Sequence, residues 1–398
     1  MKETNNVISD KNDKNLSVRS ILNAHWEAYS SKYQIPEYIQ QEVTKCLACH
    51  SPRNGCFLYY CPKCNDYVTL AFGCNSRICS CCGKRYTDQW AESLSHSMFD
   101  VPHRHFVFSV PSALWPFIYE QVSRWKIYMD AVIESLNDFM PKLLRNPQAK
   151  PAVIVILHPF GKDIKFQPHL HLIIAEGGFL PDGTFMHKRY IPADGMRKNW
   201  QYHVLKMLQE HGLANTLATK MYDDYPNGFY VWLHRNGRIS SPKKIGKYLC
   251  RYVRHPAIAD SRIDYFDDEI VKFHYYNEIV ETKVKERVDV VRTIDDFLTG
   301  LVQHIPTPQF KMIRYYGCYS RGLKRKYGSH SSIVQKKLYH YGVDRVIPCP
   351  RCGAYLEFIM YSAVPPPEKE KLTPENIEYW IRLATESEKQ KLKISQRS

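Results

Sequence analysis

Residues 167–174 read QPHLHLII and set two histidines, His169 and His171, at alternate positions of an apolar run. Because successive side chains of a β-strand point to opposite faces, both imidazoles are expected on one face. Neutral imidazoles bind divalent metals, so the pair would supply half of a metal site. A buried strand that carries two hydrogen-bonded histidines is the alternative interpretation.

The run before it supplies a third candidate ligand. Residues 151–158 read PAVIVILH, and a Pro-Phe-Gly-Lys segment at 159–162 follows this β-branched run. The pattern predicts two adjacent antiparallel strands. His158 would then lie near the turn, close enough to join the other two histidines.

A basic helix with two tyrosines is predicted further along the chain. Residues 243–254 read KKIGKYLCRYVR and are followed by a helix-ending proline. Tyr248 and Tyr252 are four residues apart and share a helix face, with Lys247 and Arg251 beside them. A phenol can attack phosphorus and form a covalent phosphotyrosine when a metal polarises the phosphate and cations stabilise the developing charge. Two tyrosines on the core face of an amphipathic helix are the alternative, which the upstream histidines disfavour.

Cysteines at metal-site spacings precede the histidines. A CxxC loop brings two thiolates to one metal, so several such loops in a short segment predict structural zinc, here two ions. Clustered thiols of this kind also indicate a reducing cytosol rather than disulfides. Spacing does not assign thiols to ions. The candidate ligands are Cys46, Cys49, Cys56, Cys61, Cys64, Cys74, Cys79 and Cys82, with His50 and Cys81 as spares.

A second, incomplete zinc motif lies near the C-terminus. Cys349 and Cys352 form half of a zinc knuckle. Its partners would be Cys318, a histidine such as His330 or His340, or no residue at all.

Composition points to a polyanionic partner. The chain has 398 residues, a net charge of +15 and a pI near 9.1, which is the charge expected of a nucleic-acid-binding protein. No apolar run approaches the ~20 residues that span a bilayer, and the N-terminal residues do not show the pattern expected of a signal peptide. The cysteine-rich segment is expected to contact DNA through Arg53, Lys63, Arg77, Lys84 and Arg85.

A basic and aromatic segment follows the tyrosine helix. Cations track phosphates while aromatic rings stack on unpaired bases, a combination that suits single-stranded DNA. A solvated basic surface is the alternative. The predicted contacts are Arg314, Tyr315, Tyr316, Arg321, Lys324, Arg325 and Lys326.

These pieces, in this order, resemble the HUH endonucleases and, more narrowly, the rolling-circle transposases of the insertion sequence 91 type. The resemblance covers roughly residues 40–330 and includes VPHRHFVFSVP at 101–111, GGFLPDG at 177–183 and RYYG at 314–317. It implies that His169, His171 and His158 hold Mg²⁺ or Mn²⁺. It also implies that Tyr252 or Tyr248, assisted by Lys247 and Arg251, cuts single-stranded DNA and leaves a 5′-phosphotyrosine.

The family pattern differs from this chain in the cysteine-rich segment. The family has histidines at the positions of Cys56 and Ile78. A cysteine in place of the first histidine keeps a ligand, whereas isoleucine in place of the second removes one. Cys46 could fill that vacancy.

We therefore expect an α+β protein with a central antiparallel sheet, helices on one face of it, and a preceding cysteine-rich zinc-binding module. The expected divisions are residues 1–45 (a mobile segment and helices), 46–100 (zinc module), 101–305 (HUH catalytic domain) and 306–398 (a basic extension with a candidate zinc knuckle).

The expected function is that of a DNA transposase. It would cleave and rejoin single-stranded DNA at transposon ends and target, at the nucleoid of a bacterial cytosol, without a membrane. A plasmid rolling-circle replication initiator or relaxase, and a non-enzymatic zinc-finger DNA-binding protein, are the alternatives.

Overall fold

The two apolar runs around the histidines form neighbouring antiparallel strands, β4 (Ala152–Phe160) and β5 (Phe166–Ala175). The computed structural model describes residues 16–51, 55–82, 94, 98–239, 257–278, 284–323, 347–362 and 377–383. In it, β4 and β5 lie in a five-stranded antiparallel sheet of order β12-β4-β5-β3-β8. The remaining strands are β3 (His103–Ser109), β8 (Val231–Ile239) and β12 (Ile313–Gly317). Both runs are continuously apolar because strands inside a sheet are covered on both faces.

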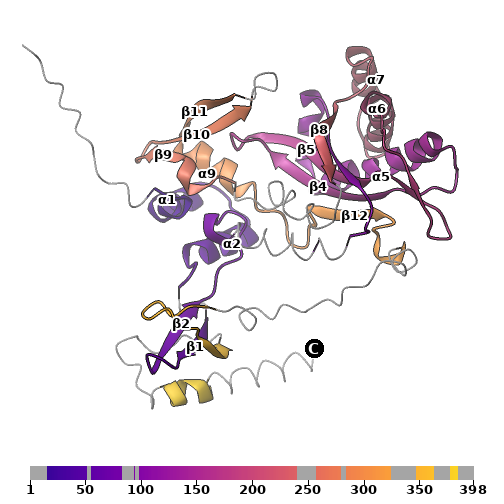
Figure 1. Cartoon of the computed structure of the whole chain (residues 1–398). Helices are drawn as coiled ribbons and strands as arrows, with labels where there is room; N and C mark the ends of the chain where they lie inside the picture. The colour runs from indigo at the N-terminus through magenta and orange to yellow at the C-terminus, as the bar shows by residue number, and fades with distance from the viewer. Residues whose placement is uncertain are drawn as a thin grey trace, which may run out of the picture.

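Helices cover one face of this sheet, as predicted. They are α4 (Trp115–Glu120), α5 (Val122–Leu144), α6 (Ala193–Gln209) and α7 (Asn215–Asp224). Alternate residues of β4 and β5, such as Val155 and Leu172, pack with α5 and α6 in one hydrophobic core. Figure 1 shows α5, α6 and α7 together on one side of the sheet. The chain thus combines helices with antiparallel sheets, which confirms the α+β class.

A second body packs against the turn between β4 and β5, where Ile164 joins its core. It contains helices α1 (Val18–Lys32), α2 (Glu37–Leu47) and α9 (Ile294–Val302) and a three-stranded antiparallel sheet of order β11-β10-β9. These strands are β9 (Ile263–Phe266), β10 (Ile270–Glu278) and β11 (Lys285–Thr293). The hairpin of β10 and β11 therefore belongs to this separate sheet and does not extend the central one.

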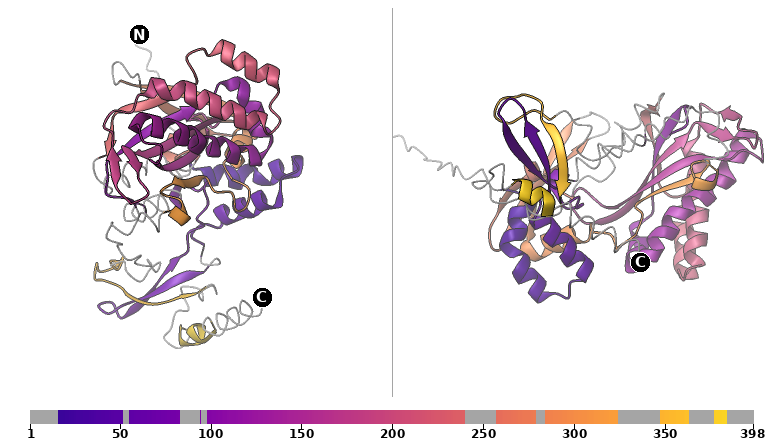
Figure 2. Two further views of the ribbon diagram at one scale, coloured as in Figure 1. Left: turned by 90° about the vertical axis from the view of Figure 1, so that its right-hand side faces the viewer. Right: turned by 90° about the horizontal axis from the view of Figure 1, so that it is seen from below.

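The cysteine-rich segment forms a third unit with the C-terminal part of the chain. Strands β1 (Cys56–Cys61) and β2 (Asp66–Ala71) pair with each other, and β13 (Glu357–Ser362) pairs with β1 on its other edge. A short helix over residues 377–383 packs through Ile377 and Trp380 on Cys56 and Leu58. Figure 2, seen from below, shows β1, β2 and the yellow β13 side by side.

These pairings correct the predicted division of the C-terminal part. Residues 306–398 are not one extension, because β12 belongs to the central sheet and β13 to the cysteine-rich unit. The N-terminal segment predicted to be mobile, residues 1 to about 18, falls mostly outside the described residues, which begin at Leu16.

Shorter elements complete the described fold. They are the hairpin of β6 (Gly177–Phe179) and β7 (Phe185–His187) and the 3₁₀ turns η2 (Ser112–Leu114) and η3 (Asp260–Arg262). Within the described part of the chain, none of the helices has the length and apolarity to cross a bilayer.

Candidate functional site

The structure brings the three predicted histidines together on the sheet face opposite to α5 and α6. His158 of β4 and His169 of β5 are directly paired, and His171 is the next residue of β5 on that face. Ring centroids lie 4.5 Å apart for His158 and His171, 5.1 Å for His169 and His171, and 5.4 Å for His158 and His169. One ring nitrogen of each histidine lies within 4.8 Å of the others. Strand pairing therefore builds a cluster that spacing alone could only suggest.

Hydrogen bonds orient two of these rings. The Nδ1 atom of His169 lies 2.8 Å from the carbonyl oxygen of Gln167, and Nδ1 of His171 lies 2.8 Å from Nε2 of His105 on β3. A proton on each Nδ1 satisfies both contacts and leaves Nε2 as the nitrogen with the lone pair. Metal-binding histidines are commonly oriented by such a bond from their second nitrogen. His105 thus acts as a hydrogen-bonded neighbour beside the sheet rather than as a member of the cluster.

Burial favours the uncharged form of two of the rings. It lowers the pKa of His169 from its ordinary value and, together with the neighbouring His158, His169 and His105, lowers the pKa of His171 well below it. A desolvated imidazole disfavours its protonated form because the low dielectric raises the cost of charge. His169 and His171 are therefore neutral near pH 7, which is the form that binds metal. Three convergent imidazoles fit a divalent cation with further positions left open.

A cavity of about 840 Å³ lies over the histidines and between the two bodies. The three histidines and Ile156 line it on the sheet side, whereas Arg262, Tyr275 and Asn277 line it from the second body. Arg77, which follows Cys74 in the cysteine-rich unit, contributes to the same wall. The cavity therefore places cations opposite a candidate metal site.

Arg262 is the functional candidate that sequence reasoning missed. Its Nε donates to the carbonyl oxygen of His274 at 2.8 Å, and its NH2 group donates to that of Lys162 at 3.3 Å. Among the described residues no carboxylate lies within ion-pair distance of it. Burial lowers its pKa, yet a guanidinium remains charged in proteins. Only the tertiary fold distinguishes this arginine, because nothing in the local sequence sets it apart from other basic residues.

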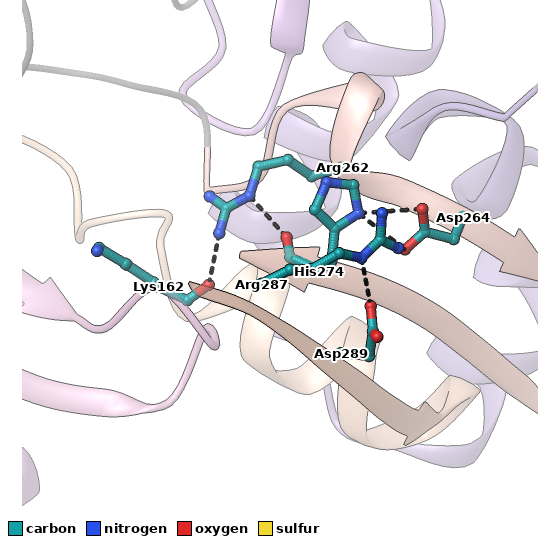
Figure 3. Close-up of polar contacts among 6 residues, drawn as sticks. All are labelled: Lys162, Arg262, Asp264, His274, Arg287 and Asp289. Atoms are coloured by element: carbon teal, nitrogen blue, oxygen red, sulfur yellow. Dashed lines mark hydrogen bonds and ion pairs between the residues drawn. The ribbon is translucent and has the colours of Figure 1, made fainter. Parts of the chain in front are cut away.

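A network of ion pairs holds the strand behind Arg262 (Figure 3). His274 Nδ1 lies 2.8 Å from Asp264 Oδ2, which also accepts from the NH2 group of Arg287 at 2.9 Å. Arg287 Nε donates to Asp289 at 2.7 Å. Arg287 is thus balanced by two carboxylates, whereas the partners of Arg262 among the described residues are backbone oxygens.

The predicted nucleophile region falls outside the described residues. This applies to Tyr248, Tyr252, Lys247 and Arg251, and also to the predicted DNA contacts Lys324, Arg325 and Lys326. The described chain resumes at Ala257, which lines the cavity over the histidines.

The other predicted DNA contacts lie on or just after β12, an edge strand that was not predicted. Arg314 stacks on Phe310, with its Cζ 5.7 Å from the ring centroid. Tyr315 and Arg321 are exposed. Tyr316 packs on the core below α5, and its hydroxyl donates to Asp130 at 2.6 Å. Tyr316 is therefore a structural residue rather than a stacking platform, which corrects the prediction.

Among the described residues, eight cysteines gather in two groups of four, and these groups differ from the predicted set. One contains Cys49, Cys74, Cys79 and Cys82; the other contains Cys61, Cys64, Cys349 and Cys352. Each group places its thiols within 4.8 Å of one another, an arrangement that fits a structural zinc ion.

Two predicted zinc ligands lie outside these groups. Cys46 lies beside the first group, with hydrogen bonds to Cys74 and Cys79. Cys56 is buried against Ile377 and Trp380. The predicted eight are thus corrected by exchanging Cys46 and Cys56 for Cys349 and Cys352, and Cys318 is not their partner.

Comparisons with known proteins agree with this arrangement. Residues 152–326 match a family model described as "Putative transposase", and residues 21–110 match the model of the transposase zinc-binding domain. The transposase of insertion sequence element IS801 from Pseudomonas savastanoi pv. phaseolicola is 27% identical over 292 residues, covering 70% of this chain and 69% of that protein. "Putative transposase y4qJ" of Sinorhizobium fredii (strain NBRC 101917 / NGR234) is 23% identical over 319 residues, covering 75% and 79%. No solved structure matches the chain.

These matches define the class of the protein as a transposase with an N-terminal zinc-binding domain. Together they support a transposase of the insertion sequence 91 family, as the order of its motifs predicted. This support favours a transposase over a replication initiator, a relaxase or a non-enzymatic zinc-finger protein.

Proposed function

We propose that this transposase cleaves and rejoins single-stranded DNA through a 5′-phosphotyrosine during rolling-circle transposition. The observation that carries the proposal is the convergence of His158, His169 and His171 at one side of a cavity whose other wall presents Arg262. The relatives are named as transposases, so their substrate class, DNA, fits a cavity whose wall includes Arg262, a cation that forms no ion pair among the described residues. The protein would act at transposon ends and target, at the nucleoid of a bacterial cytosol.

The histidine cluster would hold one Mn²⁺ or Mg²⁺. Bound there, the cation would polarise the scissile phosphate as a Lewis acid. Of the two ions, Mn²⁺ suits three nitrogen ligands better, because Mg²⁺ strongly prefers oxygen. His105 would orient His171 and keep its lone pair on Nε2.

Tyr252 or Tyr248 would supply the nucleophile. The phenol oxygen attacks phosphorus, the bond from phosphorus to the 3′ oxygen breaks, and the phenol proton is lost as the 3′ oxygen gains one. The phosphodiester energy stays in the tyrosine ester, so a 3′-hydroxyl of another strand can reverse the step without ATP. Tyr252 lies five positions before Ala257 in the sequence, and Ala257 lines the cavity.

The metal role is tested by replacing His169 or His171 with alanine. We expect cleavage of a single-stranded oligonucleotide from the element's ends, in Mn²⁺, to fall at least ~100-fold, since removing such an electrostatic contribution costs ~3 kcal/mol. DNA binding should change little. His211→Ala, an exposed histidine at the end of α6, is the control and should cleave normally. Normal cleavage by a His169→Ala, His171→Ala chain would refute the proposed site.

The nucleophile is tested by mapping a covalent adduct. A Tyr248→Phe, Tyr252→Phe chain should form no adduct with a labelled oligonucleotide on a denaturing gel, because only the phenol oxygen is nucleophilic. The single variants should differ, one losing the first cleavage and the other losing completion of strand transfer, and Tyr252 is our expected first nucleophile. An adduct that persists in the double variant would overturn the assignment.

A further inference from the structure

We infer that Cys61, Cys64, Cys349 and Cys352 bind one zinc ion that joins the two ends of the chain. The two CxxC loops are separated by the whole catalytic part of the sequence. The zinc-binding domain match covers residues 21–110 and the transposase match covers 152–326, so neither contains the second pair. The site is therefore assembled only in three dimensions.

The four thiols already have the geometry of a metal site. Sγ of Cys61 lies 3.6 Å from Sγ of Cys352, and Sγ of Cys64 lies 3.9 Å from Sγ of Cys349. Tetrahedral zinc with bonds of ~2.3 Å separates its sulfur ligands by ~3.8 Å. A disulfide needs ~2.05 Å between its sulfurs, so the observed spacing fits a shared ion better than a covalent pair.

Both loops have the turn that directs two thiols toward one ion. Asn65, which follows Cys64, has a φ of 50°, and Gly353, which follows Cys352, has a φ of 72°. Asparagine and glycine tolerate this left-handed conformation best. In the first loop the backbone N–H of Cys64 points at Sγ of Cys61 at 3.4 Å. Two segments far apart in sequence thus present matching halves of one site.

Sheet pairing sets the halves against each other. In the pairing of β13 with β1, Glu357 lies opposite Tyr60 and Ser362 opposite Cys56. The loop of Cys349 and Cys352 precedes β13, so this register brings it beside the loop of Cys61 and Cys64. Arg351 and Asp66 form an ion pair of 2.6 Å at the same place. The pairing and the ion would therefore stabilise the same arrangement.

The unit is too small to depend on apolar packing alone. The buried core around the four thiols contains only Tyr59, Cys61, Cys349 and Leu356 among the described residues. Small units of this kind commonly need a metal to fold, and the binding free energy of the metal becomes folding free energy. On binding, each thiol releases its proton to solvent. Zinc would thus attach the C-terminal strand to the N-terminal unit.

Native mass spectrometry of the full-length chain tests the shared ion. We expect two zinc ions in the wild type and one in a Cys61→Ser, Cys64→Ser chain. A Cys349→Ser, Cys352→Ser chain should also bind one, and so should the quadruple variant, because both pairs would hold the same ion. The exposed Cys81→Ser is the matched control and should retain two.

Three outcomes would overturn the inference: two ions in the Cys349→Ser, Cys352→Ser chain, a quadruple variant that loses more zinc than either pair alone, or a wild-type chain with a single ion. The ion in the other cysteine group reports that a variant is folded. If a double-serine variant loses both ions, the Cys352→His variant tests the site instead, since histidine preserves a zinc ligand. That variant should bind two ions, and fewer would count against the site.

Discussion

Single histidines in this protein owe their chemistry to burial. His171 and His103 are both almost inaccessible to solvent, yet their surroundings assign them different roles. His171 contacts other imidazoles and faces the cavity. His103 hydrogen-bonds through Nδ1 to the carbonyl oxygen of Val101 and through Nε2 to the hydroxyl of Tyr319, each at 2.7 Å. Both rings are kept neutral, but only His171 lies where a neutral ring could bind a ligand.

His103 makes stability depend on pH. Burial lowers its pKa to about 4 in the folded protein, whereas the unfolded chain has the ordinary value of ~6.5. Above pH ~6.5 the ring is neutral in both states, so its contribution to stability is fully present. Between pH ~6.5 and ~4 only the unfolded state binds the proton, and stability falls by up to ~1.4 kcal/mol per pH unit. Urea unfolding at pH 7.5, 6 and 5 should show a shallower pH dependence for His103→Gln than for the wild type. Equal slopes would contradict this account.

At the scale of elements, the turn between β4 and β5 links the histidine strands to the second body. Ile164 in this turn has a φ of 59°, a left-handed conformation that is costly for a β-branched residue. Its side chain is buried in the core of the second body. A Cβ on Gly300 of α9 would lie 3.0 Å from Cδ1 of Ile164, so glycine allows this close approach. Packing thus holds the strained turn, and the turn fixes the histidines relative to α9.

Local sequence patterns predicted the helices and strands better than they predicted which segments pair with one another. The helices before residue 46 and the strands β4 and β5 follow from patterns within each segment. The sequence predicted a basic segment where β12 lies. Its charged and aromatic residues show no strand pattern of their own and form a strand by pairing with β4. Cys349 and Cys352 could not be assigned for the same reason, since their partners lie at the other end of the chain. Pairing between segments so far apart in the sequence depends on tertiary packing, which local sequence patterns do not predict.

At the scale of the whole molecule, the site is a property of the interface between two bodies. The central sheet supplies the histidines, and the second body supplies Arg262 from η3. Figure 1 shows the second body, with β9, β10, β11 and α9, beside the end of the central sheet. A single strand of DNA that enters the cavity would contact both the histidines and Arg262. In a chain with a net charge of +15, Arg262 thus lies on the cavity wall, and no described carboxylate balances its charge.

Arg262 should therefore contribute a phosphate contact that Arg287 does not. Losing one charge-assisted contact costs ~1.5–3 kcal/mol, so Arg262→Ala should weaken binding of a single-stranded oligonucleotide at least ~10-fold, and Arg262→Lys should weaken it less. Because each neutralised phosphate releases counterions, the slope of log Kd against log salt should also fall by ~0.7. Fluorescence anisotropy across a salt series measures both quantities.

Arg287→Ala is the matched control on the neighbouring strand. Asp264 and Asp289 already balance the charge of Arg287, so the affinity for DNA and the slope should stay near the wild-type values. An unchanged slope in Arg262→Ala, or an equal loss in the two variants, would show that the wall of the cavity acts by its general charge and not through this arginine.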